Sequence, residues 1–213
     1  MPVNRDDMLD SVVEYYSARV RQLGPTPAGV DYNSTEAQQT RFRQLLRLFG
    51  DRRTFSLNDV GCGYAAFYLF LQDLGYQVRY HGCDRSQEMI DQARILVEHG
   101  KEWDFCRDAS ELQVADYTVA CALFNVKLDA GSGIWEDFIL SSLDMMAEKS
   151  TVGFAFNMLT AYSDKDHMRP DLYYGDPVFF FDLCKKKYSS NVALLHDYGL
   201  YDFTILVRLG RHR

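Results

Sequence analysis

The sequence predicts an α/β protein with a doubly wound, mostly parallel sheet of seven strands that ends in an antiparallel hairpin. Three observations support this prediction. Apolar, strand-like runs alternate with helical patterns through residues 55–157. The first of these runs ends in an acid and is followed by a Gly-x-Gly turn that opens a helix. Near the C-terminus, two further apolar runs flank a turn at Tyr198-Gly199, which is typical of a hairpin.

The first 50 residues predict two helices that cover the core. Apolar residues recur at helical spacing over residues 6–22, and a Gly-Pro pair then ends this pattern. Asn33 and Glu36 predict a capping box that opens a second helix, which should continue to Phe49. Both helices precede the alternating region and need an apolar surface to cover.

Residues 55–157 form the expected core, because strands that alternate with helices at this spacing build right-handed crossover units around a parallel sheet. The expected strands span residues 55–60, 78–83, 103–107, 117–124 and 151–157. The expected helices span residues 65–74, 134–148 and a segment that Ser86 caps and that runs to about Glu98.

Residues 158–190 are expected to form a lid followed by a helix. The lid is a long polar and aromatic connection, and loops of this length inside a compact domain are usually functional. Asp176-Pro177 predicts the start of the helix, and residues 191–209 form the hairpin. We expect residues 1–213 to make a single domain.

The composition narrows the classes of function. The formal net charge of −7 is unfavourable for general binding to nucleic acid, which requires a basic surface. The sequence has no apolar run of about 18 residues and no signal-peptide pattern, so we expect a cytoplasmic protein without a membrane segment. The five cysteines lack Cys-x-x-Cys spacing and the histidines lack paired ligand spacing, which predicts free thiols and no bound metal.

The turn after the first strand predicts a site for a positively charged, adenosine-containing cofactor. Gly61 and Gly63 allow the backbone to pass close to a ligand, where a Cβ atom would clash. Asp59 stands at the carboxyl end of the strand, where a nicotinamide-binding turn has a small or apolar residue. A carboxylate there suits S-adenosylmethionine (SAM), which carries a sulfonium and an ammonium group. Residues 55–157 are therefore expected to be a cofactor-binding core.

These residues make the chain resemble the class I SAM-dependent methyltransferases. The first motif of that family reads apolar-acid-x-Gly-x-Gly-x-Gly, and the sequence matches it through Gly63 but has Ala65 in place of the third glycine. Residues 26–33 resemble a segment that precedes this motif in a group of small bacterial methyltransferases without an assigned substrate. The resemblance implies an enzyme that uses SAM and transfers its methyl group to an acceptor.

The resemblance also implies roles for three acids at strand ends. Asp84 would accept hydrogen bonds from both ribose hydroxyls, or would instead cap the following helix. Asp59 would face the methionine end of the cofactor, or would be a structural carboxylate that caps the next helix. Asp108 would meet the adenine amino group, with Ala109 supplying a backbone amide, unless it is an acid in a surface turn.

Further cofactor contacts are implied around these acids. Arg85 and Met89 would flank the adenine, although Met89 equally fits an ordinary core position. Arg41 would bind the carboxylate of SAM with its forked guanidinium, or would be a solvated helix residue. Tyr16 would lie under the N-terminal cover, or would pack in the core. The full expected set is Asp59, Gly61, Cys62, Gly63, Asp84, Arg85, Met89, Asp108, Ala109, Phe124, Asn125, Arg41 and Tyr16.

Phe124-Asn125 ends the fourth expected strand, where the methyl group should lie. Neither an Asn-Pro-Pro-Tyr motif nor a Pro-Cys pair stands there, which argues against the amines of DNA bases and the C5 atom of pyrimidines as acceptors. We expect the lid to contact the acceptor, with a structural loop of packed tyrosines as the alternative. The expected substrate contacts are Asn157, Tyr162, Arg169, Tyr173 and Tyr174. His167 is the first candidate for a general base, and Lys127 is the second.

Three classes of function remain open from the sequence. The preferred class is methylation of a small molecule by a monomer or homodimer. The second is methylation of a protein or of tRNA, for which the arginines at positions 41, 43, 47, 52 and 53 hint at a basic surface. The third is a protein that binds SAM and performs chemistry other than methylation.

Overall fold

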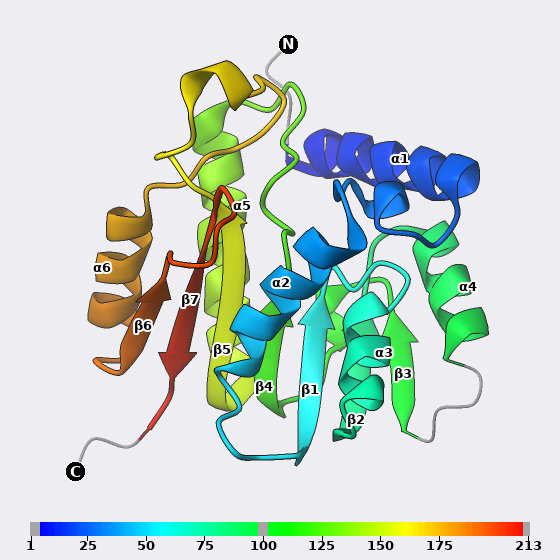
Figure 1. The fold of residues 1–213 in the computed structure, drawn as a ribbon, viewed down its shortest axis with the longest axis vertical. Coiled ribbons are helices and arrows are strands. Elements are labelled where there is room, and N and C mark those ends of the chain that lie inside the picture. Colours follow the sequence, from blue (N-terminus) through cyan, green and yellow to red (C-terminus); the bar gives the residue numbers. More distant parts are fainter. Residues whose placement is uncertain (1–4, 98–101, 211–213) are drawn as a thin grey trace.

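The computed structural model describes residues 5–97 and 102–210. Its strands are β1 (Thr54–Val60), β2 (Gln77–Cys83), β3 (Trp103–Cys106), β4 (Ala115–Ala120), β5 (Ser150–Leu159), β6 (Val192–Leu195) and β7 (Asp202–Arg208). Within these described ranges they form one seven-stranded sheet of order β3-β2-β1-β4-β5-β7-β6 (Figure 1). β1 to β5 run parallel, whereas β7 is antiparallel to both β5 and β6. This arrangement confirms the doubly wound sheet and the C-terminal hairpin predicted from the sequence.

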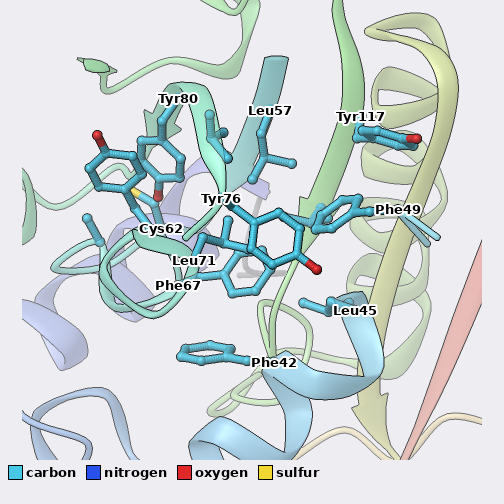
Figure 2. Close-up of a cluster of buried hydrophobic side chains, with 14 of the residues drawn as sticks. Phe42, Leu45, Phe49, Leu57, Cys62, Phe67, Leu71, Tyr76, Tyr80 and Tyr117 are labelled. Atoms are coloured by element: carbon cyan, nitrogen blue, oxygen red, sulfur yellow. The ribbon is translucent and has the colours of Figure 1, made fainter. Parts of the chain in front are cut away.

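Helices cover both faces of the sheet. The helical segments are α1 (Arg5–Leu23), η1 (Ala28–Val30), α2 (Thr35–Leu46), α3 (Ala66–Asp73), α4 (Gln87–Leu96), η2 (Ala109–Glu111), α5 (Ser132–Glu148), η3 (Lys165–His167) and α6 (Pro177–Lys187). Apolar residues of α2, α3 and α4 form one core with the sheet, and those of α5 and α6 form a second core on the other face. Figure 2 shows the first core, in which the buried rings of Phe42, Phe67, Tyr76 and Tyr117 fill the space between helices and sheet.

Both N-terminal helices cover the core, as predicted, but they cover different surfaces. α2 lies on a face of the sheet, where Phe42 is buried in the first core. α1 crosses above the carboxyl ends of the central strands (Figure 1). Hydrogen bonds fix α1 to the start of α4, with 2.7 Å between the hydroxyl oxygens of Ser17 and Ser86 and 2.9 Å between Arg21 Nη1 and Glu88 Oε1.

Two helix ends differ in detail from the sequence prediction. Ser34, and not Asn33, caps α2, because the Ser34 hydroxyl accepts a hydrogen bond from the Ala37 amide at 3.0 Å. Ser86 caps α4 as predicted, and its hydroxyl accepts the Met89 amide at 3.2 Å. Glu98, the expected last residue of that helix, lies outside the described residues.

The order of the strands places a crevice at one edge of the sheet. β1 pairs with β2 on one side and with β4 on the other, so the direction of the winding reverses between β1 and β4. Ligands of open α/β sheets bind at such a reversal, outside the carboxyl ends of the strands. β4 ends before the expected Phe124 because Ala122 turns the chain with a φ of 55°. The loops that follow β1, β2, β3 and β4 therefore open at the same edge, beneath α1.

Candidate functional site

A cavity of about 360 Å³ lies at this edge, and its volume is within the range of about 300–1,000 Å³ that is usual for small-molecule sites. The apolar face of α1, with Leu9, Val12, Val13 and Tyr16, forms its roof. The loops after β1, β2, β3 and β4 form the floor. Tyr16 therefore lies under the cover and lines the cavity.

The glycine loop after β1 has the backbone geometry that its motif predicts. Gly61 and Gly63 have φ values of 74° and 54°, and both line the cavity. A Cβ atom on Gly61 would stand 2.8 Å from Cδ1 of Leu123, which is too close. Ala65 also has a positive φ of 63°, a conformation that costs an L-residue about 1–2 kcal/mol. The loop thus keeps its shape although alanine replaces the third glycine.

Asp84 connects this loop to the start of α4. Its Oδ2 accepts the Gly63 amide and its Oδ1 accepts the Ser86 amide, each at 2.9 Å. Burial raises the pKa of Asp84, and these two amide bonds oppose that rise. A carboxylate oxygen accepts more than one hydrogen bond, and Asp84 lines the cavity. Its structural role beside α4 therefore leaves acceptor capacity for a ligand.

Asp59 is a buried acid in the wall of the cavity. Its side chain is 2% exposed, and its Oδ2 accepts the Tyr80 hydroxyl at 2.7 Å. Burial raises the pKa of Asp59 to about 7, with the Tyr80 hydrogen bond opposing the rise and the charge of Asp84 adding to it. Asp59 is not the cap of α3, whose first turn has no side-chain cap. A nearby cation would stabilise its charged form.

Four further predicted cofactor residues line the cavity. Met89 is buried and Arg85 is exposed, and both line the cavity. Asp108 and Ala109 line it as well. Asp108 caps η2, where its Oδ1 accepts the Ser110 amide at 2.9 Å, and this backbone hydrogen bond lowers its pKa. The structure thus brings the ends of β2 and β3 together in the wall of the cavity.

Arg41 does not reach the cavity. Its Nε donates to Oδ1 of Asp202 at 3.0 Å, its Nη2 pairs with the other carboxylate oxygen, and its guanidinium lies 5.0 Å from the ring centre of Tyr32. Burial alone would lower the pKa of Arg41, but Asp202 outweighs that effect and the pKa is raised. The fully buried Asp202 requires a counter-charge, and Arg41 supplies it. In this structure Arg41 is therefore neither the cofactor contact nor the solvated helix residue that the sequence suggested.

Phe124 and Asn125 are also outside the cavity lining. The Phe124 side chain is fully buried in the core beneath α5, and its carbonyl accepts the Trp135 indole N–H at 2.9 Å. The side-chain oxygen of Asn125 accepts the Leu159 amide at 3.1 Å. Because β4 ends early, these two residues tie its exit loop to β5 and α5 rather than face the crevice.

The expected substrate residues do not line the cavity. Asn157 is fully buried, and its Oδ1 accepts the Ala122 amide at 2.7 Å. Tyr162 is 68% exposed. The Tyr173 hydroxyl donates to Glu136 at 3.2 Å. Two further lid residues bind each other, because the Arg169 amide donates to the Tyr174 hydroxyl at 2.9 Å.

Neither candidate for a general base faces the cavity. His167 is exposed, with its Nδ1 3.3 Å from the Tyr201 hydroxyl. The Lys127 ammonium donates to the carbonyls of Leu128 and Ala130 at 3.2 and 3.3 Å. The cavity lining within the described chain contains neither residue. The hypothesis that either acts as a base therefore has no geometric support in this structure.

Sequence reasoning missed several residues that line the cavity, among them Tyr32, Gln38, Tyr64 and Cys121. The Tyr32 hydroxyl lies 3.3 Å from Sγ of Cys121. Tyr32 belongs to the segment that resembles small bacterial methyltransferases, which was a usable signal. Gln38 and Tyr64 had no such signal, because an amide on a helix and a tyrosine in a glycine loop are common at many other places.

Two other findings concern the described residues only. They contain no group of three or more histidine, cysteine and acidic side chains that could hold a metal ion. They also contain no helix that is both long and apolar enough to span a membrane.

Comparison with known proteins identifies the family. Residues 58–136 match the family described as a methyltransferase domain. A Mycobacterium tuberculosis protein, Rv1506c, which is provisionally named a methyltransferase, is 48% identical over 163 residues. The match covers 76% of this chain and 98% of that protein.

Solved structures share the fold at low sequence identity. Magnesium protoporphyrin IX methyltransferase from Synechocystis PCC 6803, with bound S-adenosylhomocysteine (SAH), has a TM-score of 0.68 and 12% identity, over 94% of this chain and 99% of that one. The N-methyltransferase NodS from Bradyrhizobium japonicum, also with SAH, has a TM-score of 0.65 and 15% identity, over 92% of this chain and 98% of that one. The chain belongs to the class I SAM-dependent methyltransferases, and SAM is its cofactor.

Proposed function

We propose that this methyltransferase acts on a small-molecule acceptor. The observation that carries the proposal is the position of α1, whose apolar face roofs the cavity. A cavity of about 360 Å³ has room for a cofactor and a small group at its methyl end, but a folded protein or a stacked nucleotide would require α1 to move. Several enzymes of similar fold are named for small acceptors, among them phosphoethanolamine and N-acetylserotonin.

The residues of the cavity fit SAM, and we propose the following contacts. The Gly61–Gly63 loop would lie against the cofactor backbone, Asp84 would accept the ribose hydroxyls, and Asp108 with Ala109 would bind the adenine edge. Asp59 would face the ammonium group. When bound, SAM supplies a methyl group on a sulfonium, and the neutral thioether that departs is already an excellent leaving group. The protein then contributes alignment and the exclusion of water, and alignment can provide roughly 7–11 kcal/mol.

Contacts of several of the arginines that hinted at a basic surface weigh against the alternative of a tRNA acceptor. Arg43 and Arg53 lie over aromatic rings, at 6.0 and 4.4 Å from the ring centres. Arg52 pairs with Asp116 at 3.5 Å. Phosphate binding requires basic groups that are free to replace counterions. These arginines already have partners within the protein, and the chain has a formal charge of −7.

We also propose that the chain works as a single domain, as a monomer or homodimer. Both helical layers pack on the same sheet, which supports one folding unit. Size measurements by light scattering at several concentrations would test the oligomeric state.

Methyl-labelled SAM tests the proposed acceptor class. The enzyme is incubated with a cell extract divided into a small-molecule fraction, a protein fraction and a tRNA fraction. We expect label in the small-molecule fraction, and much less label with the matched variant Asp84→Ala at the same SAM concentration. Label found only in protein or tRNA would contradict the proposal. SAM binding without transfer to any fraction would favour chemistry other than methylation.

A further inference from the structure

A pair of buried polar side chains beside the glycine loop has no role in the contacts above. Gln38 on α2 is 5% exposed and Tyr64 is 6% exposed, and both line the cavity. The Tyr64 hydroxyl lies 3.3 Å from Nε2 and 3.4 Å from Oε1 of Gln38. Both distances are at the long end of hydrogen bonding, so the two groups stay close without a strong mutual bond.

This pair has donor capacity to spare. A primary amide offers two N–H groups and a tyrosine hydroxyl offers one O–H. In the described chain, the side-chain hydrogen bonds of both residues run only to each other. Because the Tyr64 O–H is donated to Oε1 of Gln38 and one amide N–H of Gln38 to the Tyr64 hydroxyl, the second N–H of the Gln38 amide remains for an acceptor in the cavity, either water or a ligand.

The start of α3 adds further donors at the same place. α3 has eight residues and no side-chain cap at its first turn. Its first two residues, Ala66 and Phe67, line the cavity together with Tyr64. The amides of a first helical turn lack partners within the helix, and the helix dipole makes this end positive. The region around Gln38 is therefore suited to a negative group.

A buried acid borders the same cavity. Asp59 contributes a carboxylate that lines the cavity at the end of β1, just before the glycine loop. The lining of this cavity thus holds both an acid and uncharged donors with a helix start, a combination that matches an amino-acid group, in which an ammonium stands beside a carboxylate. The methionine end of SAM is such a group.

The arginine that the sequence suggested for the carboxylate is committed elsewhere. Arg41 follows Gln38 by one helical turn, but its guanidinium is bound to Asp202. We propose that Gln38 and Tyr64, with the first turn of α3, bind the carboxylate of SAM through neutral donors. This proposal rests on SAM as the cofactor. It assigns these two residues to the selection of ligands that carry the amino-acid group.

Calorimetry with two ligands tests the assignment without any measurement of activity. SAH carries the carboxylate, whereas 5′-deoxy-5′-methylthioadenosine has the same adenosine and a thioether but no amino-acid group. Gln38→Glu places a negative charge against the carboxylate, so SAH affinity should fall about 10- to 100-fold, the range for hydrogen bonds to charged groups. Methylthioadenosine affinity should change less than about 2-fold. Tyr64→Phe should follow the same pattern with a smaller loss.

Gln39→Glu is the matched control, because it adds the same charge one residue away. The Gln39 side chain accepts a hydrogen bond from Arg43 at 3.2 Å and does not line the cavity. This variant should bind both ligands as the wild type does. Gln38→Leu, which removes the amide without adding charge, supplies a second variant if Gln38→Glu does not fold in a thermal melt.

The outcomes separate this proposal from the cofactor assignment. Equal losses for SAH and methylthioadenosine would mean that Gln38 shapes the cavity rather than binds the carboxylate, and would overturn the proposal. Unchanged SAH affinity in both Gln38 variants would overturn it too. If the wild type binds neither ligand, the cofactor assignment fails first, before any role of Gln38 is at issue.

Discussion

Replacement of Asp59 by asparagine should make the ligand-free protein more stable than the wild type at alkaline pH. The same replacement should weaken the binding of SAM. Asp59 is buried, and burial raises its pKa to about 7 from its ordinary value of 3.8. Between these two values the folded protein holds a proton that the unfolded chain has lost. The unfolding free energy contributed by Asp59 therefore falls as the pH rises through this window. Asparagine removes the titration and still offers Tyr80 a side-chain oxygen.

The size of the effect follows from the difference between the two pKa values. About three pKa units correspond to about 4 kcal/mol, at 1.36 kcal/mol for each unit, and this is the largest destabilisation expected above pH 7. Packing and hydrogen bonding of the new amide add a constant that does not depend on pH. The informative quantity is therefore the difference in unfolding free energy between variant and wild type (the stability gap) and how this gap changes with pH. From pH 5 to pH 8 this gap should widen by about 2–3 kcal/mol in favour of the variant.

Urea denaturation at pH 5, 6, 7 and 8 without cofactor measures this gap, with linear extrapolation to zero denaturant. Asp137→Asn is the control, because Asp137 is exposed on α5. The difference in unfolding free energy between this variant and the wild type should stay nearly constant over the same pH range. In calorimetry at pH 8, SAM affinity of Asp59→Asn should fall about 10-fold or more, since the variant lacks a charge to pair with the cationic ligand. A gap that stays flat from pH 5 to pH 8 would refute the assignment of a raised pKa. Unchanged SAM affinity would refute the contact with the cationic end.

Three further predictions follow from the hydrogen bonds and ion pairs. Asp84→Ala should lower the unfolding free energy by about 1–3 kcal/mol, because two backbone amides lose their acceptor, and should weaken SAM binding by about 1.5–3 kcal/mol. Denaturation and calorimetry measure the two effects, and unchanged affinity would leave Asp84 with the structural role alone. Arg41→Ala should destabilise the protein by about 3–5 kcal/mol, because it leaves the buried carboxylate of Asp202 unpaired. A loss below about 1 kcal/mol in denaturation would contradict that account. His167→Ala should keep turnover within about 3-fold of the wild type in a labelled-SAM assay, whereas a fall of about 100-fold would restore His167 as a base.

Local sequence patterns were sufficient to predict the fold and the part of the cavity wall that the glycine loop, Asp59 and Asp84 form. Alternation with a period of two or of 3.6 residues reports which face of a strand or helix is buried, so the order of the elements could be read directly. The glycine motif could also be read, because a turn with positive φ close to a ligand restricts the residues that fit it. Asp59 and Asp84 stand at strand ends in a parallel sheet, and the topology alone brings such ends to one edge. The structure places both in the cavity wall.

Contacts between distant parts of the chain decided the remainder. Arg41 was expected at the cofactor, but its partner Asp202 lies 161 residues further along the chain and is visible only in the folded protein. The lid was expected at the acceptor, yet His167 and Tyr173 bind Tyr201 and Glu136 outside the cavity. Gln38 was overlooked because only the packing of α2 against the loop at Tyr64 brings it to the cavity. Periodicity records burial along one element, whereas the choice of a charge or hydrogen-bond partner depends on which elements meet, and that is fixed by tertiary packing.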